Sequence, residues 1–126
     1  MANRLTELAL DCVDPHALAP FWAEVLGYRE THRDEEGVQL TGPAGSGPTL
    51  LLVKVLERKA VKNRMHLDLN ATDRDQDAEL ERLLALGARP VDVGQGEVSW
   101  VVLADPEGNE FCLLRSRVDP LPSRTD

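Results

Sequence analysis

Apolar and polar residues alternate in two short stretches that lie far apart in the chain and match each other position by position. The first stretch runs from Glu7 to Asp11 and the second from His66 to Asn70, and in both stretches leucine occupies every second position. Alternation with a period of two predicts a β-strand with one apolar and one polar face. The two halves of the chain therefore begin with the same kind of strand.

A helical pattern follows each of these strands. In the first half, Asp14 and Pro15 are residue types that favour a helix start, and apolar residues then recur at helical spacing. In the second half, Asp73 with Gln76 three residues later predicts a capping box. Both patterns stop at a Leu-Gly pair, and glycine commonly ends helices. The pairs lie at residues 26–27 and 86–87.

Three further strands are expected after each helix, so each half has the order β-α-β-β-β. They are expected around residues 28–33, 38–41 and 49–56 in the first half, and around 89–93, 99–104 and 110–115 in the second. The sequence thus predicts an α+β fold of two modules, residues 4–57 and 62–116, within one domain of residues 1–117. The tail, residues 118–126, contains two prolines and is expected to be poorly ordered.

The polar faces of the two first strands are the candidates for a ligand site. We expect the mixed sheets of the two modules to curl around a shared cavity, with the helices packed outside. By strand parity, Glu7 and Asp11 point into it from one strand, and His66 and Asp68 from the other. Buried carboxylates are costly unless they are paired, so these acids are expected to meet a histidine, backbone N–H groups or an arginine such as Arg64.

Composition and charge exclude several classes of function. The 126 residues suffice for one domain with a core, and no apolar run approaches the roughly 20 residues that cross a bilayer. The net charge of −8 argues against nucleic acid as a partner, because phosphate binding needs a basic surface. Cys12 and Cys112, without a signal-like N-terminus, predict reduced thiols and a cytoplasmic location.

One stretch departs from the acidic character of the chain. The linker Glu57–Arg64 is basic, with Arg58, Lys59, Lys62 and Arg64, and its residues 58–64 are called the basic segment below. One interpretation is a solvated connection between the modules, and the other is a basic flap over an anionic ligand. The sequence leaves both interpretations open.

Several phrases of the sequence, in this order, resemble the vicinal oxygen chelate superfamily of lactoylglutathione lyases, bleomycin-resistance proteins and extradiol dioxygenases. Within it the chain is most similar to the small bacterial glyoxalase-like domain group, over roughly residues 5–115. The resemblance implies two paired modules around a cavity, a small-molecule ligand and a homodimer. The phrases are Leu10-Asp11-Cys12-Val13-Asp14-Pro15, Phe21-Trp22 with Leu26-Gly27, Lys62-Asn63-Arg64-Met65-His66-Leu67-Asp68-Leu69, and Asp105-Pro106-Glu107-Gly108-Asn109-Glu110-Phe111-Cys112.

The resemblance also implies where a metal would bind. The ligand positions of metal-dependent members fall on Glu7, His66 and Cys112, and the fourth falls on Leu51, in a strand that offers no His, Cys or carboxylate. A catalytic divalent ion needs about three suitable protein ligands and an open position. Glu7, His66 and Cys112 match neither the two-His, one-carboxylate set of the oxygenases nor the carboxylate-rich sites of the lyases. We therefore expect no metal cofactor, and Glu7 and His66 remain weak candidate ligands.

Other chemistry is centred on His66. Beside Glu7 or Asp68, this histidine could serve as a general base, and the other interpretation is a structural histidine hydrogen-bonded to one of these acids. Trp100, on the expected seventh strand, is a candidate stacking platform for a ligand. The candidate ligand-binding residues are Glu7, Asp11, His66, Asp68, Trp100 and Cys112.

Two functional hypotheses follow. In the first, the protein binds a small organic molecule in its cavity without a metal, as bleomycin-resistance proteins do. In the second, it is an enzyme of the glyoxalase-like group, an isomerase or lyase that uses His66 with Glu7 or Asp68 and possibly a divalent metal. The incomplete ligand set favours the first hypothesis, and the inward-facing titratable groups support the second.

Overall fold

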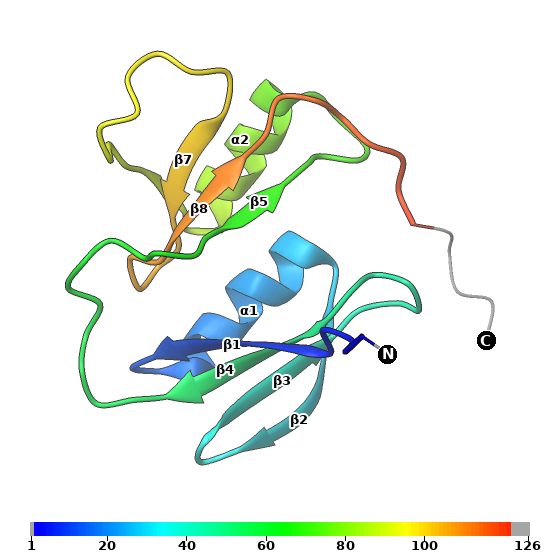
Figure 1. The fold of residues 1–126 in the computed structure, drawn as a ribbon, viewed down its shortest axis with the longest axis vertical. Coiled ribbons are helices and arrows are strands. Elements are labelled where there is room, and N and C mark those ends of the chain that lie inside the picture. The colour runs from blue at the N-terminus through cyan, green and yellow to red at the C-terminus, as the bar shows by residue number, and fades with distance from the viewer. Residues whose placement is uncertain (1, 122–126) are drawn as a thin grey trace. The chain divides into compact units, whose positions relative to one another are not determined.

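A four-stranded mixed sheet with the order β1-β4-β3-β2 forms the first half of the chain (Figure 1). Strand β1 (Glu7–Cys12) pairs in parallel with β4 (Thr49–Lys54), and β3 (Gly37–Thr41) runs antiparallel to both β4 and β2 (Arg29–Asp34). Helix α1 (Pro15–Leu26) contacts β3, β4 and β2. The computed structural model describes residues 2–121, which divide into two compact units: residues up to 58 together with Leu121, and residues 59–120.

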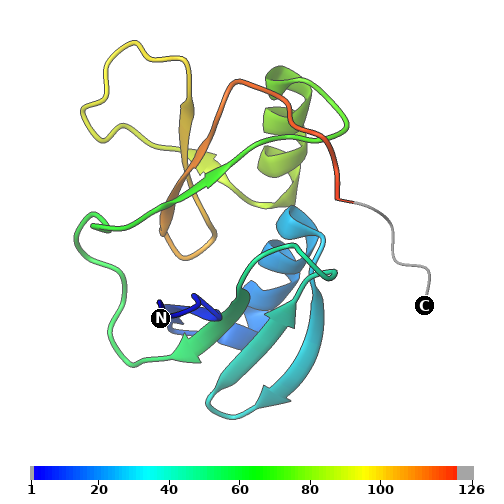
Figure 2. The same cartoon turned by 45° about the vertical axis from the view of Figure 1, so that its right-hand side comes forward.

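The second unit repeats this topology with the order β5-β8-β7-β6. Strand β5 (Leu67–Leu69) pairs in parallel with β8 (Glu110–Leu113), and β7 (Val101–Ala104) runs antiparallel to β8 and β6 (Arg89–Pro90). Helix α2 (Gln76–Leu86) covers one face of this sheet (Figure 2). The predicted α+β fold of two β-α-β-β-β modules is confirmed. The sheets are not closed, and a cavity shared by both modules stays a prediction.

The N-cap residue predicted from the sequence is correct for one helix and wrong for the other. For α1, Asp14 is the N-cap as predicted, and its side chain accepts a hydrogen bond from the Ala17 N–H at 3.1 Å. For α2, the prediction of Asp73 is wrong: the N-cap is Asp75, which accepts from the Ala78 N–H at 2.8 Å. Asp73 instead pairs with Arg74. Two aspartates two positions apart both suit a helix start, so residue type alone did not distinguish them.

Strand parity agrees with the structure in both units. On the first sheet, Leu50 and Leu52 are buried and the Glu7, Ala9 and Asp11 side of β1 is exposed. On the second, Phe111 and Leu113 are almost completely buried, and Phe111 stands beside Leu67. The apolar face of each sheet forms core, so the other face is available for a site.

Several strands are shorter than their sequence pattern predicts. Within the described part of the chain, strand β5 pairs with β8 alone, and their ladder runs from the pair Leu67–Phe111 to the pair Leu69–Leu113. Strand β6 is only two residues long, Arg89–Pro90, and one further hydrogen bond joins the Val91 N–H to the carbonyl of Val102 at 3.0 Å. The expectation that Trp100 lies on the seventh strand is wrong, because β7 begins at Val101. Trp100 therefore belongs to the loop between β6 and β7.

The outer strand β2 is unusual because all six of its residues are exposed. Its register with β3 shifts between Glu30 and His32, which marks a bulge, and Arg33 pairs with Glu30 across it. His32 is thus exposed on this strand.

The turn between β7 and β8 is organised by a buried carboxylate. Asp105 is completely buried, and its side chain accepts hydrogen bonds from the backbone N–H groups of Glu107 and Asn109, both at 2.9 Å. The Asn109 side-chain amide donates to the same carboxylate at 3.0 Å. This turn sets the direction in which β8 leaves.

Two sequence expectations concern parts of the chain outside these sheets. Among the described residues, no helix is long and apolar enough to cross a membrane. Of the tail, the Val118 N–H donates to the carbonyl of Ala71 at 3.0 Å, and residues 122–126 lie outside the described residues. A poorly ordered tail stays a prediction.

Candidate functional site

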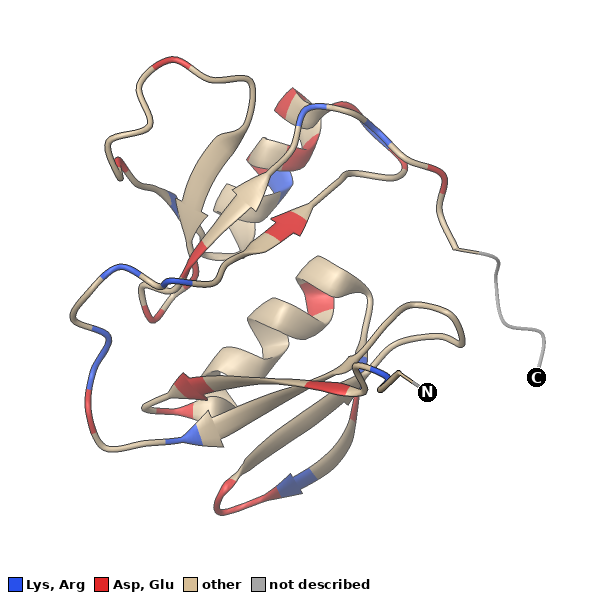
Figure 3. Ribbon diagram, in the orientation of Figure 1, with Lys and Arg blue, Asp and Glu red and all other residues tan. Residues whose placement is uncertain are grey.

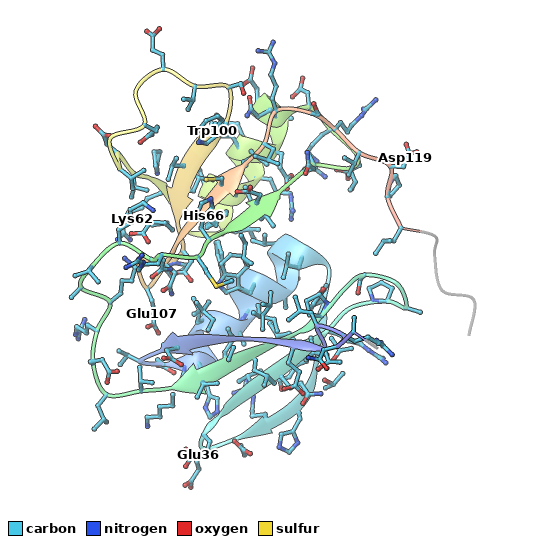
Figure 4. The ribbon with its side chains drawn as sticks, in the orientation of Figure 1. Glu36, Lys62, His66, Trp100, Glu107 and Asp119 are labelled. Atoms are coloured by element: carbon cyan, nitrogen blue, oxygen red, sulfur yellow. The ribbon has the colours of Figure 1, made fainter. Side chains whose placement is uncertain are left out.

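The second unit holds a pocket on the polar face of its sheet. Its volume is about 480 Å³, within the range typical of small-molecule sites. Strand parity builds the floor, because Val102 and Cys112 are neighbours on β7 and β8 and face the same side. Figure 4 labels Lys62, His66 and Trp100 around it. The lining residues are Lys62, His66, Asp68, Val93, Gly94, Gln95, Trp100, Val102, Glu110, Cys112 and Leu114.

The loop from β6 to β7 supplies one wall of the pocket. Gln95 folds back on its own loop, where its side-chain oxygen accepts from the Val93 N–H at 2.8 Å. Gln76 of α2 donates to the carbonyl of Ser99 at 2.9 Å, next to Trp100. The indole of Trp100 is 41% exposed, an unusual position for the largest apolar side chain. The loop thus presents a flat apolar surface to the pocket.

Three potential ligand atoms meet at the pocket floor. The Nε2 atom of His66 lies 3.3 Å from Oδ1 of Asp68, and the ligand atoms of His66, Asp68 and Cys112 all lie within 4.8 Å of one another. Parallel pairing explains the cluster, because Asp68 of β5 stands beside Cys112 of β8. Burial, the negative charge of Asp68 and a hydrogen bond to it raise the pKa of the Cys112 thiol. Cys112 is thus a neutral thiol at neutral pH.

A second polar group of the pocket, Glu110, is bound by the basic segment. One carboxylate oxygen accepts from Lys59 Nζ at 2.7 Å, and the other accepts from the backbone N–H of Asn63 at 2.9 Å. Burial alone raises the pKa of Glu110, but these hydrogen bonds outweigh burial and lower the pKa below its ordinary value. Glu110 is therefore an ionised anchor that holds residues 59–63 against the start of β8.

The positions implied for a metal do not fit a divalent ion. Leu51 offers no donor atom, and the register places Thr49, another non-ligand for such an ion, beside Glu7. A different set, His66, Asp68 and Cys112, could hold an ion, since all three residue types are known zinc ligands. Glu7 as a ligand stays a prediction.

The structure brings together most of the residues singled out in the sequence. His66, Asp68, Trp100 and Cys112 line the pocket, whereas Glu7 and Asp11 stand exposed on β1 of the first unit. The part that these two acids have in a ligand site stays a prediction. Asp68 was expected to pair with a histidine, an arginine or backbone N–H groups, and the structure pairs it with His66. Arg64, the arginine named for this role, is exposed.

Sequence reasoning missed several residues that line the pocket. Glu110 and Leu114 lie two positions before and after Cys112, and Val102 pairs with Cys112 across the sheet. The alternation of a strand could therefore have indicated that all three face the same side as Cys112. Val93, Gly94 and Gln95 lie in an irregular loop, where no periodicity indicates which side chains face inward.

Comparison with known proteins now adds to this geometry. The sequence matches the family described as "Glyoxalase-like domain" over residues 7–114, which is most of the chain. The chain belongs to the glyoxalase-like domain family. The predicted resemblance is thereby confirmed, and the family falls within the vicinal oxygen chelate superfamily. No curated protein matches the sequence.

Solved structures share the fold of this glyoxalase-like chain at low sequence identity. A glyoxalase/bleomycin resistance protein/dioxygenase family enzyme from Burkholderia phytofirmans PsJN is similar with a TM-score of 0.69 and 17% identity, covering 88% of this chain and 97% of its own. The fosfomycin resistance protein FosX from Listeria monocytogenes has a TM-score of 0.70 and 17% identity, covering 94% of each chain. The bleomycin-binding protein from Streptomyces verticillus, solved with copper(II)-bleomycin, has a TM-score of 0.60 and 19% identity, covering 93% of this chain and 100% of its own.

Proposed function

We propose that this glyoxalase-like chain binds a small organic molecule in the pocket of its second unit, without a metal ion, as a cytoplasmic homodimer. The observation that supports binding most directly is the pocket itself. It combines an apolar floor and wall, formed by Val102, Leu114 and Trp100, with a few polar groups at its edge. Apolar lining with a small number of placed polar groups is typical of small-molecule sites.

Two observations support the parts of the proposal that concern metal and location. Leu51, which has no donor atom for a metal ion, occupies the strand-four position. Both cysteines are buried and form no disulfide within the described residues, in keeping with a reducing compartment. The names of structurally similar proteins favour binding as well, because one binds bleomycin and another confers fosfomycin resistance.

The test is binding of naphthylmethanol, a neutral aromatic probe, by isothermal titration calorimetry. We expect saturable binding that is unchanged by a chelator, and about tenfold weaker binding in Trp100→Ala, because the ring loses its aromatic contact. Leu56→Ala is the matched control, since Leu56 is 91% exposed and does not line the pocket. Equal weakening by both variants, or no binding at all, would overturn binding in this pocket. Binding that disappears with the chelator and returns with zinc would overturn its independence of metal.

A second candidate function is catalysis by the His66–Asp68 pair. The 3.3 Å contact between His66 Nε2 and Asp68 Oδ1 favours it, since a carboxylate can orient an imidazole and stabilise its charged form. If the pair is catalytic, the protein depletes one compound of a bacterial metabolite extract, followed by mass spectrometry. His66→Ala would abolish that depletion, while Arg64→Ala, an exposed neighbour, would not. Depletion that is the same in His66→Ala would exclude this function for His66.

A further inference from the structure

The polar groups of the pocket differ in how far they are already engaged within the protein. The carboxylate of Glu110 already accepts hydrogen bonds from Lys59 and from the Asn63 N–H, and the Gln95 side chain is hydrogen-bonded within its own loop. Asp68 faces His66 and Cys112. The ammonium group of Lys62 has a single described hydrogen bond, to the neighbouring carbonyl of Asn63 at 3.2 Å. An ammonium group has three N–H donors, so Lys62 has donors for a ligand.

Glu110 determines where Lys62 lies. Its two carboxylate oxygens bind Lys59 on one side of Lys62 and the Asn63 backbone on the other. The short stretch between these contacts is therefore fastened at both ends to the first residue of β8. Lys62 lies directly between them and lines the pocket. A lysine on a loop without these two contacts would lack such positioning.

The charge around this lysine contrasts with the rest of the chain. The net charge of the chain is −8, yet no acid occurs between Glu57 and Asp68. Figure 3 shows the basic segment as a run of blue on the connection that leads into β5. Of the residues that line the pocket in the described part of the chain, Lys62 is the one lysine or arginine. Local positive charge of this kind raises the concentration of anions at a site.

We propose that the pocket selects molecules that carry an anionic group, such as a carboxylate, on a flat apolar body, with Lys62 binding the anionic group and Trp100 the flat body. This inference rests on the proposed function and names the ligand class for the same pocket. It also gives the basic segment a role, since the segment carries Lys62 to the mouth of the pocket. Lysine binds such groups as a compact point charge, so a range of anionic groups fits.

Three probes with the same ring test the inference by calorimetry: naphthoate, naphthylmethanol and naphthylmethylammonium. We expect naphthoate to bind about tenfold more tightly than the alcohol, and the ammonium probe more weakly than either. Lys62→Gln should remove the naphthoate preference, so that naphthoate and the alcohol bind with about the same affinity. Arg64→Gln is the matched control. It also removes one positive charge, two residues along the chain from Lys62, but the Arg64 side chain does not line the pocket. High ionic strength should weaken naphthoate binding alone.

The outcomes separate this inference from the proposed function. Equal binding of naphthoate and the alcohol, both weakened by Trp100→Ala, overturns the anion preference and leaves small-molecule binding standing. Loss of preference in Arg64→Gln as well as Lys62→Gln overturns the direct contact and attributes the preference to the general field of the segment. No binding of any probe overturns the proposed function together with the inference.

Discussion

Replacing Asp105 with alanine is expected to lower the free energy of unfolding by about 3 kcal/mol, because several buried N–H donors would lose their acceptor. The carboxylate is completely buried and accepts from two backbone N–H groups and from the side chain of Asn109. No water can replace these bonds without opening the turn. Equilibrium denaturation with urea measures the change.

Asp92→Ala is the control for this prediction. Asp92 also accepts a backbone hydrogen bond, from the Gly94 N–H at 2.8 Å, but its side chain is exposed and water can replace it. We expect its loss to cost less than about 1 kcal/mol. Similar costs for both variants would show that burial of Asp105 does not determine its effect. Asp105→Asn should lie between them, since the amide oxygen keeps one acceptor.

Replacing Glu110 with alanine is expected to cost about 2 to 3 kcal/mol in unfolding free energy and to remove the preference of the pocket for anions. The side chains of Lys59 and Glu110 are only 17% and 13% exposed, so the substitution leaves Lys59 as a largely buried charge without its partner. It also releases the Asn63 N–H, and with it the position of Lys62. Urea denaturation and the naphthyl probes measure the two effects. The double variant Lys59→Met/Glu110→Met should recover part of the stability but none of the preference.

The stability from Glu110 should depend on pH in a stated direction. Its pKa is lower in the folded protein than its ordinary value, so the unfolded chain binds the proton more readily. The contribution is therefore complete at neutral pH and is lost as the pH falls through the range of the lowered pKa. The difference between the wild type and Glu110→Ala should shrink on acidification. A difference that is constant with pH would exclude the ionised anchor.

Much of the site followed from the period of two in the strands. The period predicted that His66 and Asp68 share one polar face, and the resemblance placed a ligand position on Cys112. The structure brings all three to one pocket floor, because β5 and β8 pair in parallel. The Lys59–Glu110 contact joins residues 51 positions apart, and nothing in local pattern indicates such a pair. For Trp100, the residue type indicated a ligand surface, and Trp100 does line the pocket. Its position outside β7 could not be predicted, because it depends on how the glycine-containing loop before it folds.

The outer edges of the two sheets have a consequence for how copies of the chain meet. An edge strand with free N–H and C=O groups invites strand addition and aggregation. At β2 the exposed charges and the bulge near Thr31 oppose it, and at β6 the ladder is only two residues long and ends in a proline. Growth of either sheet by a foreign strand is thus disfavoured at these edges by two independent means. Because the Val91 N–H bonds the carbonyl of Val102, the backbone of Pro90 faces the free edge. Replacing Pro90 with valine would therefore give that edge an N–H donor for strand addition.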